Sequence, residues 1–408
     1  MGPAQPSGRG RGPPVSAPAV GGGRWVSLWG LALVPLLLLG AVLAYLVATG
    51  GGLQALQGPP VEQVKIGRVT LPERGVIQVQ VVNDGPQAIT VPQVMVDDAF
   101  WSFTARPAGA IPRLGTATLT IPYPWVEGEA HKVALLTSLG TVFEAEIPVA
   151  TLTPQPGRDL FVRFGLVGLY VGVVPVLLGM LWFPWMRRLT PTAMNFILAL
   201  TVGLLVYLAV GTYLDAQEFA AALPAFWQGT PAVLLIALLT LGVLLALGGQ
   251  RRPGDAPLGL SYRIATGIGL HNLGEGLAIG AAFALGEAAL GTFLILGFTL
   301  HNITEGVGIV APVVRHQPRL IQFAQLALIA GGPAILGTWL GGFAFNPVLA
   351  TVFLAVGVGA IVQVVWEVGR LVARNTAALG APLVGWSTLG GFTVGVALMY
   401  FTAFFVKF

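Results

Sequence analysis

The sequence contains no cysteine and has few charged residues. Cysteine is absent from all 408 residues, which excludes disulfide bonds, thiolate metal ligands and a thiol nucleophile. Charged residues make up 9% of the chain and hydrophobic residues 55%, whereas soluble proteins carry about 25% charged residues. With a mean hydropathy of +0.80, the chain has too little polar surface to face water. A soluble enzyme is therefore excluded, and we expect an integral membrane protein.

The basic residues are dispersed. The 21 Lys and Arg residues raise the isoelectric point to about 9.6, a value that nucleic-acid-binding proteins share. Most of them lie in short loops between apolar segments, where positive charge sets membrane topology. We therefore expect membrane lipid as a partner and no nucleic acid.

The first 48 residues predict a tail and an anchor. Residues 1–25 are rich in Gly and Pro and carry three arginines, so they predict a disordered cytoplasmic tail. The apolar run 26–48 is longer than the roughly 7–15 residues of a signal-peptide core, which favours a retained transmembrane anchor. Cleavage near Ala48 remains the alternative.

Residues 55–155 differ from the rest of the chain. Apolar and polar residues alternate at 76–82 and again at 88–91, and the turn sequence Asn83-Asp84-Gly85 separates these two segments. Short alternating segments between turns predict a small antiparallel β-domain, of sandwich type. Its single histidine, His131, and its scattered acids show no metal-binding pattern. We expect an interaction or shielding module, whose partner the sequence does not identify.

Residues 160–408 form a helical region. Eight long apolar runs predict transmembrane helices, which gives nine spans with the anchor; they lie at 162–185, 193–214, 231–249, 260–285, 289–314, 320–343, 346–368 and 384–406. Arginine pairs occupy alternate loops, at 187/188, 251/252, 315/319 and 370/374. Because positive loops stay in the cytoplasm, the N-terminus is predicted inside, and the β-domain and C-terminus outside. We expect a multi-pass protein of the inner plasma membrane.

One motif occurs twice within these runs. His271-Asn272-Leu273-Gly274-Glu275-Gly276 lies in the fourth run, and His301-Asn302-Ile303-Thr304-Glu305-Gly306 lies in the fifth. Positions i, i+1 and i+4 share one face of a helix, within an arc of roughly 100°. The two runs are consecutive and antiparallel, so two imidazoles, two amides and two carboxylates are predicted to converge.

Two carboxylates in mid-membrane need compensation. An uncompensated carboxylate there costs about 2.5–3.5 kcal/mol on insertion scales, and a divalent cation between Glu275 and Glu305 would cancel both charges. Histidine with carboxylate suits Zn, and also Fe, Mn, Co, Ni and Cu. The alternative is that the two copies only hydrogen-bond neighbouring helices. Because intramembrane ionisable residues usually mark function, we favour a metal path.

The two motifs resemble the signature of the ZIP family of divalent metal transporters, in particular its bacterial branch with HNxPEG in the fourth and fifth helices. The resemblance covers residues 160–408 and implies an eight-helix core, transport by alternating access towards the cytoplasm, and often a homodimer. It implies a metal path that takes zinc, iron, manganese or cadmium as transported substrate, with no further cofactor. The residues that it implicates in a binuclear site are His271, Asn272, Glu275, His301, Asn302 and Glu305.

This sequence departs from the family pattern at three places. Gly274 and Thr304 replace the proline of each motif; glycine can loosen a helix, whereas threonine can only bond back to a carbonyl. Gly332 stands before Pro333 where the family usually has glutamate, which puts the second metal in doubt. Where the family often has a methionine in its second helix, this chain has Gly203-Leu204-Leu205.

Three further acids are candidates for the ends of the path. Asp215 and Glu218 follow the second run and would form an acidic entrance that concentrates cations; the alternative is an ordinary solvated loop. Glu367 lies at the inner end of the seventh run. It is a candidate for the exit; the alternative, which we favour, is an intrahelical pair with Arg370.

Two other functions compete with transport. An intramembrane metal hydrolase would use a bound metal, water and a carboxylate base, but the chain has no H-E-x-x-H motif and the two copies match each other closely. A metal sensor without transport is the other alternative. We expect a transporter and not an enzyme, with the preferred metal undecided.

Overall fold

The computed structural model describes residues 2, 23–49, 62–154, 157–221, 223–224, 227–249, 257–284 and 288–406. The chain divides into two units, Met1–Pro60 and Val61–Phe408. In the first unit, the anchor run forms helix α1 (Gly23–Thr49), with Pro35 inside it. Most of the predicted tail lies outside the described residues, as do Arg251, Arg252 and Lys407, while the last three residues of the tail, 23–25, belong to α1.

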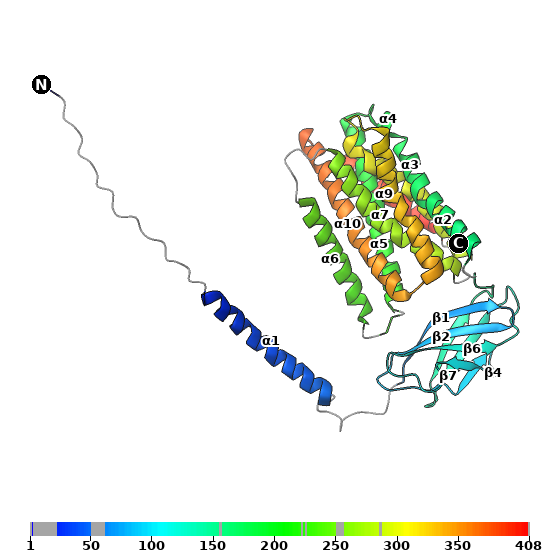
Figure 1. Cartoon of the computed structure of the whole chain (residues 1–408). Coiled ribbons are helices and arrows are strands. Elements are labelled where there is room, and N and C mark those ends of the chain that lie inside the picture. The colour runs from blue at the N-terminus through cyan, green and yellow to red at the C-terminus, as the bar shows by residue number, and fades with distance from the viewer. Residues whose placement is uncertain are drawn as a thin grey trace. The chain divides into compact units, whose positions relative to one another are not determined.

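The β-domain consists of eight strands in two four-stranded antiparallel sheets (Figure 1). One sheet has the order β1-β2-β6-β5 and the other β4-β3-β7-β8. The strands are β1 (Val64–Glu73), β2 (Val76–Asn83), β3 (Gln93–Val96), β4 (Ala99–Trp101), β5 (Thr104–Arg106), β6 (Thr116–Pro122), β7 (His131–Leu136) and β8 (Val142–Ile147). The predicted antiparallel β structure is thus present. The prediction of a strand at 88–91 is wrong, because only an isolated bridge from Ile89 to Ile111 forms there.

The period-two pattern builds the core of this domain. In β2, Ile77, Val79 and Val81 are fully buried, while Gln80 is exposed. They share one apolar cluster with residues of the other sheet, such as Val94 and Leu135. The two sheets therefore bury one common core, as the alternation predicts.

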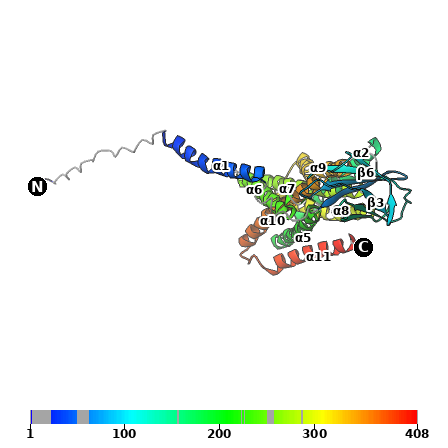
Figure 2. The same ribbon diagram turned by 90° about the horizontal axis from the view of Figure 1, so that it is seen from below.

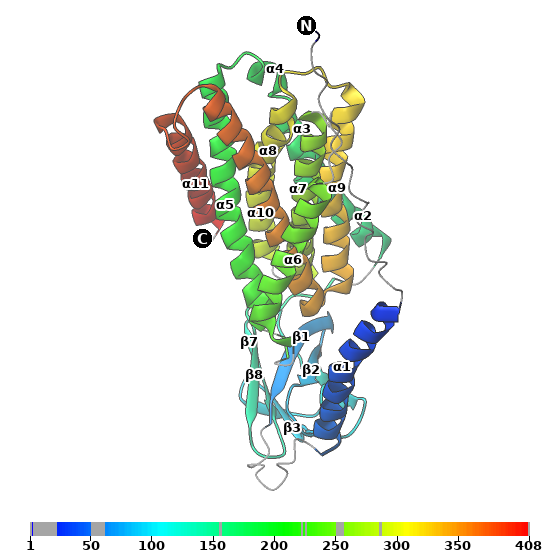
Figure 3. The same cartoon turned by 90° about the vertical axis from the view of Figure 1, so that its left-hand side faces the viewer.

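The helical part contains a helix at each of the eight predicted runs. The first run is α2 (Arg158–Gly168), a π-helical turn (Leu169–Val173), α3 (Val174–Met180) and α4 (Phe183–Met186). Next come α5 (Pro191–Ala221), α6 (Gly229–Gly249), α7 (Pro257–Ala284), α8 (Ala288–Val310), a 3₁₀ turn (Ala311–Val313), α9 (Leu320–Ala344), α10 (Pro347–Ala378) and α11 (Trp386–Val406). Figure 2 and Figure 3 show α11 beside α5, with α10 on the other side of α5.

Among the described residues, six helices are long and apolar enough to cross a membrane. They are Arg158–Met186, Pro191–Ala221, Gly229–Gly249, Leu290–Val313, Leu320–Ala344 and Pro347–Ala378. On α6, Leu235 and Leu239 are 66% and 68% exposed, which suits contact with lipid rather than water. A helical membrane protein therefore accounts for this part of the chain, whereas the count of nine spans and their orientation stay predictions.

Helices α7 and α9 pack with their backbones in contact. A Cβ atom on Gly276 of α7 would lie 2.2 Å from the carbonyl oxygen of Ala334, and one on Gly337 of α9 would lie 2.2 Å from that of Leu273. Only glycine permits this approach, which is how small residues bring membrane helices together. The first motif is therefore carried on a helix whose position is fixed by α9.

Strand β1 is hydrogen-bonded to the ends of two helices. Lys65 Nζ donates to the carbonyl of Ala221, the last residue of α5, at 2.8 Å. Arg68 Nη2 donates to the carbonyl of Ala284, the last residue of α7, at 3.3 Å. Cations are favoured at helix C-termini, where carbonyl groups lack helical partners.

Substituting Gly276 by alanine should disrupt the α7–α9 contact. The added Cβ would overlap Ala334, so we expect Gly276→Ala to destabilise the protein by about 1–3 kcal/mol. Gly242→Ala in α6 is the control, because a Cβ there has nothing within 4 Å, and it should be neutral or stabilising by up to about 1 kcal/mol. Thermal unfolding of both variants in detergent tests this; equal shifts of the midpoint would refute it.

Asp97 in the β3–β4 turn organises a small polar cluster. Its Oδ2 accepts a hydrogen bond from Tyr123 at 2.7 Å and lies 2.7 Å from His131 Nδ1, and its Oδ1 accepts from the Lys132 amide at 2.8 Å. Burial alone would raise the pKa of Asp97, but these hydrogen bonds outweigh it and lower that pKa. The bond to Asp97 in turn raises the pKa of Tyr123 to about 12.

This cluster predicts a pH dependence of the β-domain. Because its folded pKa is lowered, the Asp97 carboxylate stabilises the domain above its ordinary pKa of about 3.9, and this contribution is lost as the pH falls below that value. Asp97→Asn should cost up to about 1 kcal/mol at neutral pH, reduced by solvent because the Asp97 side chain is 39% exposed.

Asp98→Asn is the matched control for this prediction. Asp97 and Asp98 both have positive φ, at 50° and 64°, a conformation that asparagine also tolerates. Fluorescence-detected unfolding of the full chain between pH 7 and 3 should show a weaker acid destabilisation for Asp97→Asn only. The same acid profile in Asp97→Asn and the parent would contradict the assignment.

Candidate metal site

The two repeated motifs lie on α7 and α8, and their polar residues are buried. His271, Asn272 and Glu275 belong to α7, and His301, Asn302 and Glu305 belong to α8. None of the six residues is more than 6% exposed. The i, i+1, i+4 spacing therefore directs both sets inward, as expected from the helical repeat.

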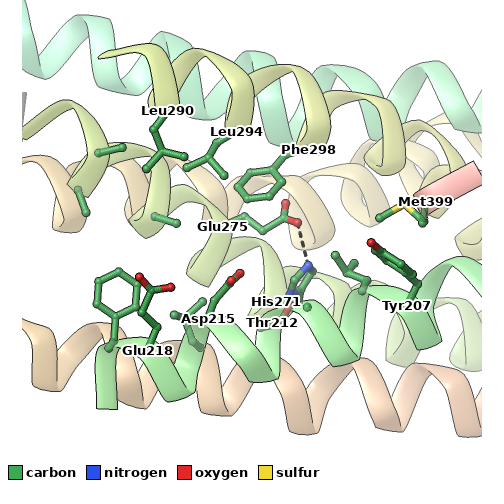
Figure 4. A pocket seen from close by; sticks show the side chains of 17 residues that line it. Tyr207, Thr212, Asp215, Glu218, His271, Glu275, Leu290, Leu294, Phe298 and Met399 are labelled. Atoms are coloured by element: carbon green, nitrogen blue, oxygen red, sulfur yellow. Dashed lines mark hydrogen bonds and ion pairs between the residues drawn. The ribbon is translucent and has the colours of Figure 1, made fainter. Parts of the chain in front are cut away.

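Glu275 is the centre of the cluster. Its Oε1 lies 2.9 Å from His271 Nε2 and 2.6 Å from His301 Nε2, and Figure 4 shows the contact with His271. One ligand atom from each of the three residues lies within 4.8 Å of the others. Two imidazole nitrogens and a carboxylate at this spacing could hold one transition-metal ion.

The two asparagines also contact the backbone of neighbouring helices. Asn302 Nδ2 donates to Val171 O at 3.0 Å, and Asn272 Nδ2 donates to Ala330 O at 3.0 Å. Val171 precedes Pro175 by four residues, so its carbonyl lacks a helical N–H partner because proline has none. Ala330 lies in the turn before Pro333. Each asparagine thus supports a helix that proline interrupts.

The amide oxygens remain available for a ligand. Asn272 Oδ1 and Asn302 Oδ1 are buried and have no hydrogen-bond partner among the described residues. Asn302 Nδ2 also lies 3.4 Å from Glu275 Oε2. The asparagines therefore combine hydrogen bonds to neighbouring helices, the alternative that the sequence left open, with two oxygen atoms that a metal could use.

Glu305 is not part of the close cluster. Neither of its carboxylate oxygens has a hydrogen-bond partner within the described part of the chain. With His301 it lines a separate cavity of about 10 Å³, whose other walls include Thr201 and Leu205 of α5. Thr304 donates back to the carbonyl of His301 at 2.6 Å, the bond expected of a threonine at the family's proline position. The expected convergence of all six side chains on one point is therefore only partly realised.

A cavity of about 420 Å³ leads to His271 and Glu275. Asp215 and Glu218, which are exposed near the end of α5, line the same cavity, and Figure 4 shows them on the helix that also carries Thr212. Leu290, Leu294 and Phe298 of α8 form an apolar wall. The two acids therefore lie on α5 itself, rather than past its end in a loop, and share a cavity with the buried cluster.

Sequence reasoning missed Met399 of α11, which lines this cavity and the smaller one beside Glu305. The only signal was that the chain has 6 methionines and that this one interrupts an apolar run. Gly203, at the position where the family often has methionine, packs against α11 instead, since a Cβ there would lie 2.2 Å from Phe392 O.

Gly332 leaves space for a side chain. A Cβ at this position would meet only Leu328 of its own helix within 4 Å. A Cβ at Gly332 would therefore be accommodated once the flexible Leu328 side chain, 3.3 Å away, shifts by a few tenths of an ångström.

Glu367 pairs with a different arginine from the one expected. Its Oε1 lies 3.0 Å from Arg263 Nε of α7, and Glu367 is 6% exposed. Arg370 instead lies over the ring of Trp366, 5.8 Å from its centroid. The expected pair with Arg370 is wrong, because Glu367 faces α7 in the bundle while Arg370 extends along the outside of α10. This ion pair lies on α7 at the end away from the large cavity.

A search of protein-family models found no match to this chain, and a search of curated proteins found none either. The resemblance to ZIP transporters therefore rests on the two motifs and their helices.

Asn302 and Glu305 should respond differently to substitution in metal-free protein. Asn302→Ala removes the partner of the buried Val171 carbonyl, and we expect a loss of about 1–3 kcal/mol. Glu305→Gln removes a buried acid without hydrogen-bond partners among the described residues, so it should be neutral or stabilising. Thermal unfolding in the presence of a chelator measures both, and an equal destabilisation by Glu305→Gln would contradict the distinction.

Proposed function

We propose that the protein carries a divalent transition-metal ion across the membrane through the cluster of His271, Glu275 and His301. The observation that supports this most directly is the placement of two imidazoles and a carboxylate within 4.8 Å in a buried position. A carboxylate in such an apolar surrounding is costly unless its charge is matched. A divalent cation supplies that charge and accepts all three ligand types.

The large cavity supports a path rather than a closed structural site. It joins the exposed acids Asp215 and Glu218 to the buried ligands. Acidic groups at a mouth raise the local concentration of cations. A purely structural metal site has no need of such access, because its ligands close around the ion.

The transported ion is proposed to be zinc first, with iron, manganese and cadmium as further substrates. Nitrogen ligands favour zinc over magnesium or calcium. Glu305 and the oxygens of Asn272 and Asn302 are proposed as additional contacts during passage, since none of them has a hydrogen-bond partner in the described residues. The arginine-bearing loops favour an inward-facing N-terminus, with the β-domain and C-terminus extracytoplasmic, and transport towards the cytoplasm.

Flux through liposomes tests this proposal. Purified protein is reconstituted, and uptake of Zn²⁺, Mn²⁺, Fe²⁺ and Cd²⁺ is followed with an enclosed fluorescent chelator. We expect saturable uptake of at least one ion, and a reduction of about tenfold or more in Glu275→Gln and His301→Ala, because each removes a ligand. Glu146→Gln and His316→Ala, at exposed positions in the β-domain and in a loop, should retain the parent rate.

The competing functions give different outcomes. No saturable flux of any ion by folded protein would refute transport. Metal binding that depends on Glu275 without flux would favour a sensor. Hydrolysis of a peptide or lipid that depends on metal and on Glu275 would favour an enzyme.

A further inference from the structure

The outer face of the β1–β2 sheet carries a group of polar side chains. Thr70 of β1 is paired with Gln78 of β2, and Arg68 lies two residues before Thr70. Side chains two apart on a strand share a face, so Arg68, Thr70 and Gln78 lie together. Val79, which points the other way, is completely buried in the domain core. The alternation that builds the core therefore also places these three polar groups on the opposite face.

Arg68 has an incompletely matched charge. Its guanidinium is half-buried, and this burial lowers the pKa of Arg68. Its Nη2 donates to the Ala284 carbonyl, whereas its Nε is buried and has no hydrogen-bond partner among the described residues. No described ion pair includes Arg68. A half-buried cation with an unused donor is unfavourable unless an anion or acceptor completes it.

A cavity of about 190 Å³ lies next to this guanidinium. Arg68, Thr70, Gln78 and Thr153 provide its polar walls, and Gly342 and Phe343 of α9 close another side. Thr153 is held in place by the Leu71 amide, which donates to its Oγ1 at 2.8 Å. Among the described residues, the cavity is therefore lined by a cation, two hydroxyls and an amide, and by no acid.

The cavity lies at the end of a candidate membrane span. Gly342 and Phe343 are among the last residues of the span Leu320–Ala344. Aromatic rings gather at the same end: Phe161 stacks on Trp339 at 4.3 Å and lies 6.3 Å from Phe343. Trp side chains such as Trp339 are enriched at the membrane–water boundary, which is the level of phospholipid phosphates.

We propose that this cavity binds a phosphate group, held by Arg68 and completed by the hydroxyl and amide groups of its wall. A planar guanidinium with free N–H groups matches phosphate oxygens in geometry and charge. The phosphate comes from a phospholipid headgroup at the membrane surface or from free phosphate, since the recognising chemistry is the same. The site is separate from the His–Glu cluster and does not depend on metal transport.

Ligand-induced stabilisation of the full chain tests the proposal. The protein in uncharged detergent is titrated with inorganic phosphate and, separately, with a soluble short-chain phosphatidylglycerol, against sodium chloride at equal ionic strength. We expect a saturable rise of the unfolding midpoint with at least one probe. A rise with inorganic phosphate identifies a site for the free anion, and a rise with phosphatidylglycerol alone identifies a headgroup site.

Variants decide whether Arg68 is responsible. Arg68→Gln should weaken the apparent affinity about tenfold or more, because a hydrogen-bonded charge is lost. Arg68→Lys keeps the charge but not the planar fork, and it should also weaken binding. Lys65→Gln is the matched control, because it removes the other β1 cation that contacts a helix end but does not line the cavity.

The outcomes are distinct even if Arg68→Gln does not fold. Gln78→Leu then serves as a second variant, since it removes a polar wall group without touching the bond from Arg68 to Ala284. The proposal is overturned if neither probe gives a saturable rise. It is also overturned if Arg68→Lys and Gln78→Leu both bind like the parent, or if Lys65→Gln weakens binding as much as the Arg68 variants.

Discussion

The burial of the Glu275 carboxylate between two imidazoles is the interaction on which the helical core depends. Its Oε1 contacts His271 within its own helix and His301 on α8, so one oxygen atom joins the two copies of the motif. The side chain of Glu275 is 3% exposed, and the imidazoles on both sides are the polar groups that its Oε1 meets. The position of α7 relative to α8 is therefore tied to this contact, because separating the helices would remove His301 and Asn302 from the carboxylate and leave it only His271 of its own helix.

The surrounding helices are arranged to allow this contact. Glycines bring α7 and α9 together until backbone meets backbone, as at Gly276 and Gly337. Asn272 and Asn302 each donate to a carbonyl just ahead of a proline in a neighbouring helix. The Val171 carbonyl, which Pro175 leaves without its usual N–H partner four residues on, is thus satisfied by Asn302, and the amide oxygens of both asparagines have no hydrogen-bond partner among the described residues.

The β-domain buries one apolar core between its sheets and contacts the helical part through strand β1. Its alternating strands bury one apolar core between two sheets. The outward residues of β1 then meet the helical part, where Lys65 and Arg68 reach the last carbonyls of α5 and α7. Both of these helices line the cavity that leads to Glu275. The β-domain, whose composition differs from the rest of the chain, is therefore joined by hydrogen bonds to two of the helices that line the cavity.

Much of this arrangement follows from local patterns, because they depend on backbone geometry and solvent. Each of these patterns lies within one helix or strand. Apolar runs long enough for a bilayer predicted the helices, alternation at period two predicted strands, and the spacing of four residues between His and Glu predicted the inward face of the motifs. Contacts between elements could not be predicted. Three contacts depend on the rotations of helices and the distances between them, which only packing sets. Glu367 meets Arg263 rather than Arg370, Met399 lines the cavity, and Glu305 lies apart from Glu275. The sequence by itself determined which residues are available in the membrane, and the tertiary structure decided which of them meet, since side chains far apart in the chain are brought together only when the helices pack.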